Sequence, residues 1–282
     1  MKKIIILLLL LTTYIFSNIK AIVSIAPELT FVKAIGGNKV NVSLMVQIGS
    51  SPHTYEPKPS QMIAIAKSDL YFAIGVEFEH VWLPKFHSLN KNMQIINLAN
   101  NITKIEMKQS HHIHKAHDEH DNKDPHIWTS PTNVKIISQN IYKALSTVDP
   151  SNAIYYKNNL KLFLSKVDNT DKKIRKYLSA LKNSNNFMVF HPSWGYFAKE
   201  YKLKQITVEV EGKSPKPREL VILTTEAKNE NISAIFTQAE FSDAFAKIIA
   251  NELHIPVVKI TPMATNWSEN LIFMAKTIAG EK

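Results

Sequence analysis

The chain has 282 residues, of which 45% are hydrophobic and 21% charged, the profile of an ordinary globular protein. It contains no cysteine, so disulfides and thiolate zinc sites are excluded, and any transition-metal site must use His and carboxylate ligands. The formal charge of +10 comes from scattered lysines without aromatic–basic interleaving, and the chain has no Gly-rich phosphate loop, so we do not expect nucleic-acid binding.

The first residues have the pattern of a secretory signal. Lys2 and Lys3 precede an apolar run at positions 4–11, and small or polar residues follow it. The run is too short for a membrane-spanning helix, which needs about 20 apolar residues. We therefore predict a signal peptide over residues 1–20 and export to the periplasm. Because a lipid-anchored precursor needs a cysteine at its cleavage site, the processed protein is expected to carry no lipid anchor.

After the signal, short β-branched runs alternate with amphipathic stretches. The apolar runs predict strands at 19–25, 40–46, 70–74, 94–98, 187–190, 205–210, 234–237 and 257–260. The amphipathic stretches predict helices at 59–67, 78–89, 131–148, 217–229 and 243–253. Such alternation predicts an α/β protein with parallel sheets covered by helices.

The alternation breaks once, in the middle of the chain. Asp149-Pro150-Ser151 opens a stretch of about 30 residues in which apolar residues recur at helical spacing. At about 1.5 Å per residue such a helix spans about 45 Å, more than one lobe needs. Four predicted strands lie on each side of it. We therefore predict two α/β lobes, residues 21–148 and 183–282, each with a roughly four-stranded, mostly parallel sheet, joined by a long connecting helix over 149–182.

Residues 111–121 have a strongly biased composition, with five histidines, three carboxylates and no apolar period. This composition predicts a mobile loop. The loop offers several two- or three-ligand combinations for a metal, and closing a mobile loop costs conformational entropy, so such sites should be weak. The alternative is a solvated polar segment without function. The candidate low-affinity ligands are His111, His112, His114, His117 and His120.

Three of the six remaining histidines stand where ligands could converge. His53 follows the second predicted strand, His191 comes directly after the strand at 187–190, and His126 precedes a helix start. In open α/β sheets, ligands bind beyond the carboxyl ends of the strands. The large separations between the three match no local zinc-finger spacing, so position alone leaves a three-His site as a hypothesis.

The segments around these histidines resemble the zinc and manganese (cluster A-I) solute-binding proteins of ABC importers. The matching segments are Val23-Ser24-Ile25 with Pro27, Pro52-His53 with Tyr55-Glu56-Pro57, Asp124-Pro125-His126 with Trp128, and Phe190-His191 with Gly195-Tyr196-Phe197. With the His-rich loop and the long helix, the chain is similar to the zinc branch of this family, the ZnuA-like proteins. The resemblance implies a metal ion held between two lobes by His53, His126 and His191.

The resemblance also bears on the choice of metal. Manganese-type members place a Glu where this chain has His191, and three imidazoles suit zinc better than manganese. Many relatives carry an Asp near the last strand where this chain has Thr261, so the fourth ligand stays open. Asp124 and Glu56 are candidate carboxylates for orienting a ligand imidazole.

The predicted function is therefore zinc capture without catalysis, by a periplasmic monomer. The protein is expected to deliver Zn²⁺, its transported ligand, to an ABC permease and its ATPase subunit. Alternatives are a manganese-binding member of the same family, an exported zinc-dependent hydrolase and a surface adhesin. The hydrolase is considered because three His with an open position also describe catalytic zinc. However, the sequence has no HExxH helix, no G-x-S-x-G elbow and no Walker motif.

Overall fold

The computed structural model describes residues 18–107, 123–179, 181, 185–209, 214–232, 234–238 and 241–281. Two four-stranded sheets organise these residues, with strand orders β2-β1-β3-β4 and β6-β5-β7-β8, and every pair of neighbouring strands is parallel. The predicted α/β fold with two parallel sheets is confirmed. Both predicted sets of four strands form. The central strands of each sheet are mostly buried, as their apolar runs indicate, whereas edge strands are more exposed.

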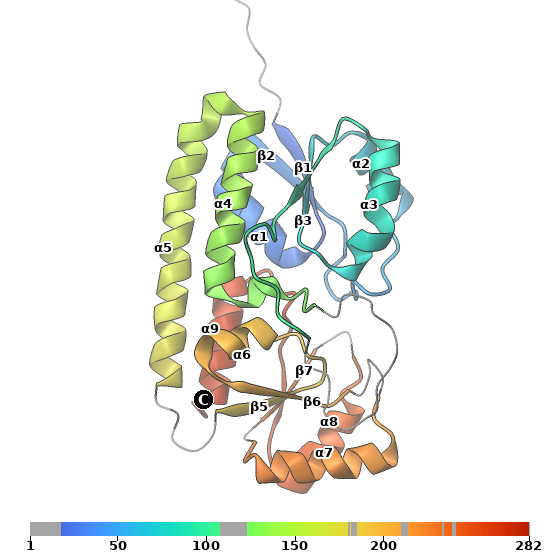
Figure 1. Ribbon diagram of the computed structural model, residues 1–282, viewed down its shortest axis with the longest axis vertical. Coiled ribbons are helices and arrows are strands. Elements are labelled where there is room, and N and C mark those ends of the chain that lie inside the picture. The colour runs from blue at the N-terminus through green and yellow to red at the C-terminus, as the bar shows by residue number, and fades with distance from the viewer. Residues whose placement is uncertain are drawn as a thin grey trace, which may run out of the picture.

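The N-terminal lobe is built on the first sheet, with strands β1 (Ile19–Val23), β2 (Val40–Leu44), β3 (Leu70–Ala73) and β4 (Gln94–Asn97). Helices cover both faces of this sheet, as Figure 1 shows. One face carries α2 (Pro59–Ala66) and α3 (Glu77–Leu89), and the other carries α1 (Ala26–Gly36) and α4 (Pro131–Val148). A short 3₁₀ turn, η1 (Gly37–Lys39), leads into β2, and η2 (Ile127–Thr129) leads into α4.

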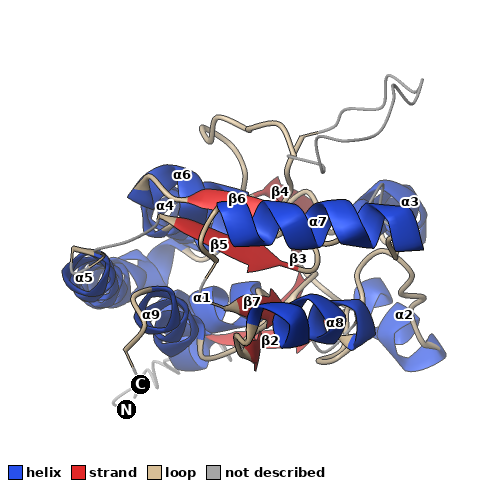
Figure 2. Cartoon of the chain, turned by 90° about the horizontal axis from the view of Figure 1, so that it is seen from below, coloured by secondary structure: helices blue, strands red, loops and turns tan. Residues whose placement is uncertain are grey.

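The C-terminal lobe repeats this plan with β5 (Asn186–Val189), β6 (Lys204–Thr207), β7 (Ile235–Thr237) and β8 (Val257–Lys259). Its helices are α6 (Gly195–Tyr201), α7 (Pro217–Asn229), α8 (Ala244–Leu253) and α9 (Trp267–Ile278). Helices α7 and α8 lie side by side on one face, as seen in Figure 2, over a small apolar core of their own.

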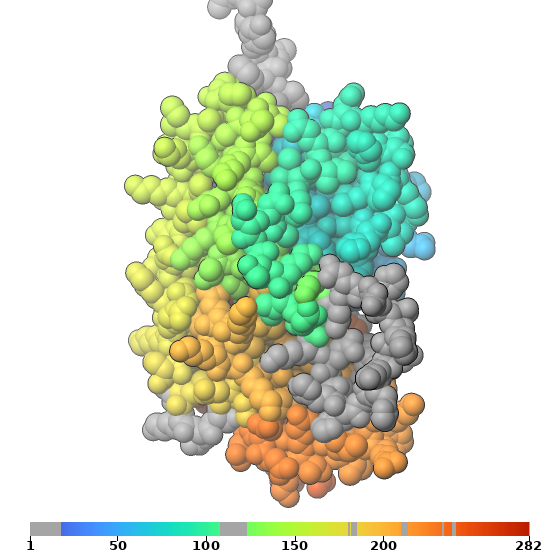
Figure 3. All heavy atoms as spheres, viewed as in Figure 1, coloured from blue at the N-terminus to red at the C-terminus, as the bar shows by residue number. Residues whose placement is uncertain are grey.

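A single long helix runs along both lobes. It is α5 (Ala153–Leu178), and the 3₁₀ turn η3 (Pro150–Asn152) precedes it. In Figures 1 and 3 it forms one side of the whole molecule, packed against α1 and α4 at one end and α9 at the other. Its buried side chains recur every three or four residues from Tyr156 to Ile174, so one stripe of the helix faces both lobes. The predicted long helix is confirmed.

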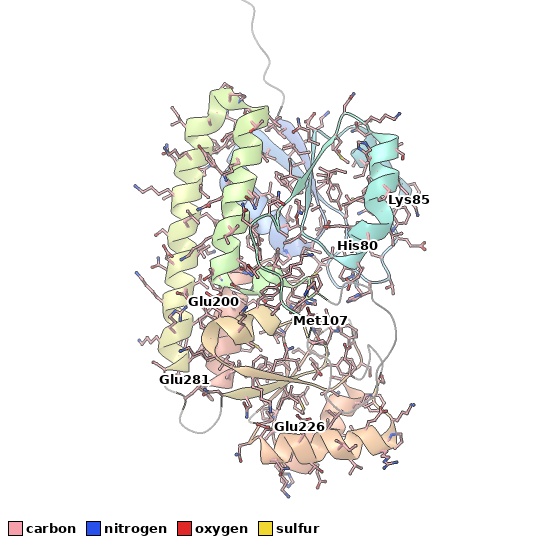
Figure 4. All side chains as sticks on the ribbon, in the orientation of Figure 1. His80, Lys85, Met107, Glu200, Glu226 and Glu281 are labelled. Atoms are coloured by element: carbon pink, nitrogen blue, oxygen red, sulfur yellow. The ribbon has the colours of Figure 1, made fainter. Side chains whose placement is uncertain are left out.

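Polar contacts also join the lobes. The indole Nε1 of Trp128 donates to the carbonyl of Pro262 (2.8 Å), and the indole of Trp267 donates to the carbonyl of Trp128 (2.7 Å). Glu200 of α6, which Figure 4 places at the level where the lobes meet, accepts hydrogen bonds from Thr132 Oγ1 (2.7 Å) and Ser130 Oγ at the start of α4. The lobes are therefore fixed to each other next to the loops that carry the candidate ligands.

Two buried acids end the central strands of the N-terminal lobe earlier than the apolar pattern predicts. The Glu28 carboxylate accepts from the backbone N–H groups of Ser24 (3.1 Å) and Ile25 (3.0 Å), and Glu79 accepts from those of Ile74 (2.9 Å) and Gly75 (2.7 Å). Donors that would otherwise extend the ladder are thus used by side chains. Accordingly, β1 ends before Ser24 and β3 before Ile74.

Two predictions fall wholly or mostly outside the described residues. The predicted signal peptide, residues 1–20, lies mostly outside them, and its last two residues, Ile19 and Lys20, pair with β2. The end of the signal stays a prediction. The His-rich loop, 111–121, also lies outside the described residues. Among the described residues, no helix has the length and apolarity needed to cross a bilayer.

Candidate metal centre

The three histidines that the sequence singled out come together where the two lobes meet. His53 lies in the loop that follows β2, His126 stands directly before η2, and His191 follows β5. The ring centroids of His53 and His191 lie 5.3 Å apart, and those of His126 and His191 lie 5.4 Å apart. His191 of the C-terminal lobe therefore contacts two imidazoles of the N-terminal lobe.

These separations suit a zinc ion. Zinc–nitrogen bonds of about 2.0–2.1 Å at a tetrahedral angle place the centroids of two coordinating imidazoles about 5 Å apart. Among the described residues, no group of three or more His, Cys, Asp or Glu side chains already meets the geometry of a metal site. The chemistry of the donors fits a borderline-soft divalent ion, because imidazole nitrogen is a favoured zinc ligand.

The imidazole of His126 is held by Asp124. Both side chains are buried, and the carboxylate Oδ1 lies 2.8 Å from the ring Nδ1 and accepts from the backbone N–H of His126 at 2.9 Å. A carboxylate can only accept, so the proton belongs on Nδ1 and the lone pair on Nε2. The sequence-predicted role of Asp124 as an orienting carboxylate agrees with this geometry.

The imidazole of His191 is enclosed on several sides. Glu209 Oε1 lies 2.8 Å from its Nδ1, and the ring of Phe241 stacks on it with centroids 5.2 Å apart and planes at 26°. The backbone N–H of His191 donates to the side-chain oxygen of Gln238 (3.4 Å). Its Nε2 is buried and has no hydrogen-bond partner among the described residues. An unpaired buried nitrogen is costly, which marks this atom as one that awaits a ligand.

His53 is the least enclosed of the three. About 32% of its side chain is exposed, and Glu77 Oε2 lies 3.3 Å from its Nδ1. Burial lowers the pKa of His53 below the ordinary value of 6.5, although the nearby Glu77 carboxylate acts in the opposite direction. The neighbouring imidazoles lower this pKa further. His53 is therefore biased towards its neutral form, the form that coordinates a metal.

Glu77 and Glu209 were not predicted from the sequence. The carboxylate proposed beside His53 was Glu56, but its side chain is exposed, and Glu77 is the acid that contacts the ring. Glu77 and Glu209 each come shortly after a strand, so a search for acids at the carboxyl ends of strands would have found both. The Thr261 side chain forms a local hydrogen bond, in which its Oγ1 accepts from the backbone N–H of Met263 (3.1 Å).

The described residues on either side of the gap that contains the His-rich loop lie near this centre. Met107, the last described residue before the gap, stands at the level where the lobes meet in Figure 4. On either side of the gap, Glu106 and Lys123 pair as an isolated antiparallel bridge, and their side chains form an ion pair. Asp124 follows at once, so the base of the loop lies next to the residue that holds His126.

Comparison with known proteins adds an independent line of evidence. Residues 22–279 match a family model described as zinc-uptake complex component A, periplasmic (ZnuA). The fold is similar to a crystal structure of ZnuA, with a TM-score of 0.86 and 39% sequence identity, covering 94% of this chain and 99% of that chain. It is also similar to a ZnuA deletion mutant with zinc bound, with a TM-score of 0.84 and 39% identity, covering 93% of this chain and 97% of that one.

A relative named for a different metal is more distant in sequence. The manganese ABC transporter substrate-binding lipoprotein scaA of Streptococcus gordonii is 27% identical over 257 residues, covering 85% of this chain and 77% of its own length. The family model spans nearly the whole described chain and both lobes, so the match is not confined to the candidate centre.

Proposed function

This chain belongs to the ZnuA family of metal-binding components of ABC uptake systems, and we propose that it captures Zn²⁺ in the periplasm and delivers it to a membrane permease. The family consists of substrate-binding components of transporters, so the chain is not an enzyme and the exported-hydrolase hypothesis is dropped. The metal ion is the transported ligand. The permease, with its ATPase subunit, is the partner that such a component requires.

One observation carries the choice of zinc. In the part of the chain that the structure describes, the buried Nε2 of His191 has no partner, and the ring lies beside the imidazoles of His53 and His126. Three nitrogen donors favour zinc, whereas manganese prefers carboxylate oxygens. The zinc-bound ZnuA relative at 39% identity supports the same choice over the manganese-named relative at 27%.

Several further features belong to this proposal. The signal at the N-terminus would export the chain, and the division into lobes at residues 148/149 and 182/183 would leave the metal between two bodies joined by α5. The two lobes share hydrogen bonds beside the centre, such as that from Trp128 to Pro262, so we expect little hinge motion when the metal binds. The protein is expected to act as a monomer.

Zinc titration of single variants tests the assignment. Replacing His53, His126 or His191 by Ala should weaken zinc binding by more than about 100-fold, because that much can be lost even when a partner of a ligand is removed. His87, exposed on α3, provides a matched control whose removal should change nothing. If all three variants keep wild-type affinity, the centre is wrongly assigned. Competition between Zn²⁺ and Mn²⁺ would separate the two family branches.

A further inference from the structure

We propose that Glu209 is a positioning residue for metal capture, holding the His191 imidazole so that its Nε2 faces the other two rings. This inference rests on the proposed function, since it concerns the same centre. The proposal is based on the contact between Glu209 Oε1 and His191 Nδ1, which lie 2.8 Å apart in two buried side chains.

The sheet fixes the carboxylate in place. The backbone N–H of Glu209 donates to the carbonyl of Phe190 at 3.1 Å, just beyond the paired ends of β5 and β6. Glu209 and His191 therefore stand just beyond the ends of two adjacent strands, and His191 directly follows the hydrogen-bonded Phe190. Because this backbone hydrogen bond continues the pairing of β5 and β6, it fixes the distance between acid and imidazole.

The remaining contacts leave the ring one direction for a ligand. Glu209 covers Nδ1 and Phe241 covers one face of the ring, with planes at 26°. The other ring nitrogen, Nε2, is buried and lacks a hydrogen-bond partner within the described ranges. A carboxylate accepts but does not donate, so Glu209 keeps the proton on Nδ1 and the lone pair on Nε2. Its negative charge also favours a divalent cation at the far side of the ring.

The three imidazoles differ in this support. Asp124 holds His126 from the N-terminal lobe as Glu209 holds His191 from the C-terminal lobe, both at 2.8 Å and both buried. Glu77 stands 3.3 Å from His53, and about 49% of its side chain is exposed. Water screens an exposed charge, so Glu77 should matter much less than Glu209.

Zinc competition titration and the visible spectrum of bound Co²⁺ test the proposal. Glu209→Ala should weaken zinc binding about 10- to 100-fold and alter the Co²⁺ spectrum, because the ring loses its orienting partner. Glu209→Gln should lose less zinc affinity and keep the tetrahedral Co²⁺ spectrum, because the amide oxygen of Gln can still accept a hydrogen bond from Nδ1–H. Glu77→Ala should weaken zinc binding less than Glu209→Ala does. Glu252→Gln, an exposed acid on α8, is the matched control and should bind like the wild type.

The outcomes separate this proposal from the proposed function. If Glu209→Ala folds and binds Zn²⁺ as tightly as the wild type while His191→Ala does not, the positioning role is refuted and the centre stands. The positioning role and the assignment of the centre both fail if zinc also binds normally to His53→Ala, His126→Ala and His191→Ala. Should Glu209→Ala not fold, Glu209→Asp decides, because its shorter carboxylate stops short of Nδ1. Unchanged zinc affinity in that variant would likewise overturn the proposal.

Discussion

Gly195, at the start of α6, lies so close to Asp124 that a single added methyl group should disturb the metal centre from the opposite lobe. A Cβ atom at this position would lie 2.4 Å from Asp124 Oδ2 and 3.3 Å from Ile105 Cδ1. The first distance is shorter than real Cβ contacts, so the carboxylate must move by about 1 Å. Asp124 cannot move alone, because its other oxygen holds the ring and backbone of His126.

The size of the effect follows from what Asp124 holds. Displacing a carboxylate that orients a ligand imidazole typically costs about 10- to 100-fold in metal affinity. Crowding a close-packed contact costs about 1–3 kcal/mol of unfolding free energy. We therefore expect Gly195→Ala to fold, with a lowered melting temperature, and to bind zinc at least about 10-fold more weakly than the wild type.

The assay is zinc competition titration combined with thermal unfolding of the metal-free protein. Gly280→Ala is the control, because Gly280 has a φ of +72° and no neighbour within 4 Å of an added Cβ. That variant should lose about 1–2 kcal/mol of stability through backbone strain and keep its zinc affinity. If Gly195→Ala binds zinc as tightly as the wild type, the contacts of Asp124 Oδ1 with His126 do not orient the imidazole for metal binding.

Three further predictions concern pH and the His-rich loop. Zinc affinity should fall in acid as protons compete for the imidazoles, and the lowered pKa of His53 delays this competition below the ordinary value of 6.5. A dissociation constant that stays flat from about pH 8 to pH 5 would contradict an imidazole centre. Burial and the charge of Glu79 raise the pKa of Glu28 well above 4.5, so folding keeps a proton that the unfolded chain loses. The stability of the wild type relative to Glu28→Gln should therefore fall as pH rises above about 4.5, as denaturant unfolding at several pH values would show. Deleting residues 111–120 should keep the tight site and remove weaker zinc binding in calorimetry. An unchanged weak phase would mean that the loop does not collect zinc.

The fold was predictable because its central strands are buried on both sides. β3 is apolar throughout, and Lys20 is the one charged residue of β1. The limits of both strands were missed where Glu28 and Glu79 take the backbone donors. Helices α1, α6 and α9 were not predicted, and α6 has only seven residues, too few to show a clear helical period.

The candidate centre was only partly predictable from the sequence. His53 and His191 could be selected because they follow strands, and open α/β sheets gather their ligands at the carboxyl ends of strands. His126 could be selected because it directly precedes a helix start. The acids that hold them could not be paired from sequence alone. Glu209 is 18 residues from His191 and meets it only because β5 and β6 are neighbours. Glu77, at the start of α3, meets His53 in the loop after β2, 24 residues earlier in the chain.

The attachment of α9 to the N-terminal lobe makes the two lobes one folding unit. Trp267 packs edge-on against Phe31 at 5.6 Å, and Thr30 Oγ1 donates to the carbonyl of Thr265, 235 residues away, at 2.6 Å. Contacts between residues so far apart in the sequence form late in folding, since a long loop must close before they stabilise the structure. A chain stopped before residue 266 would lose the contact of Trp267 with Phe31, although Phe163 of α5 would still pack on that ring. The first lobe should therefore reach its full stability only after the last helix has been synthesised. Heat or denaturant should then unfold both lobes in a single cooperative transition.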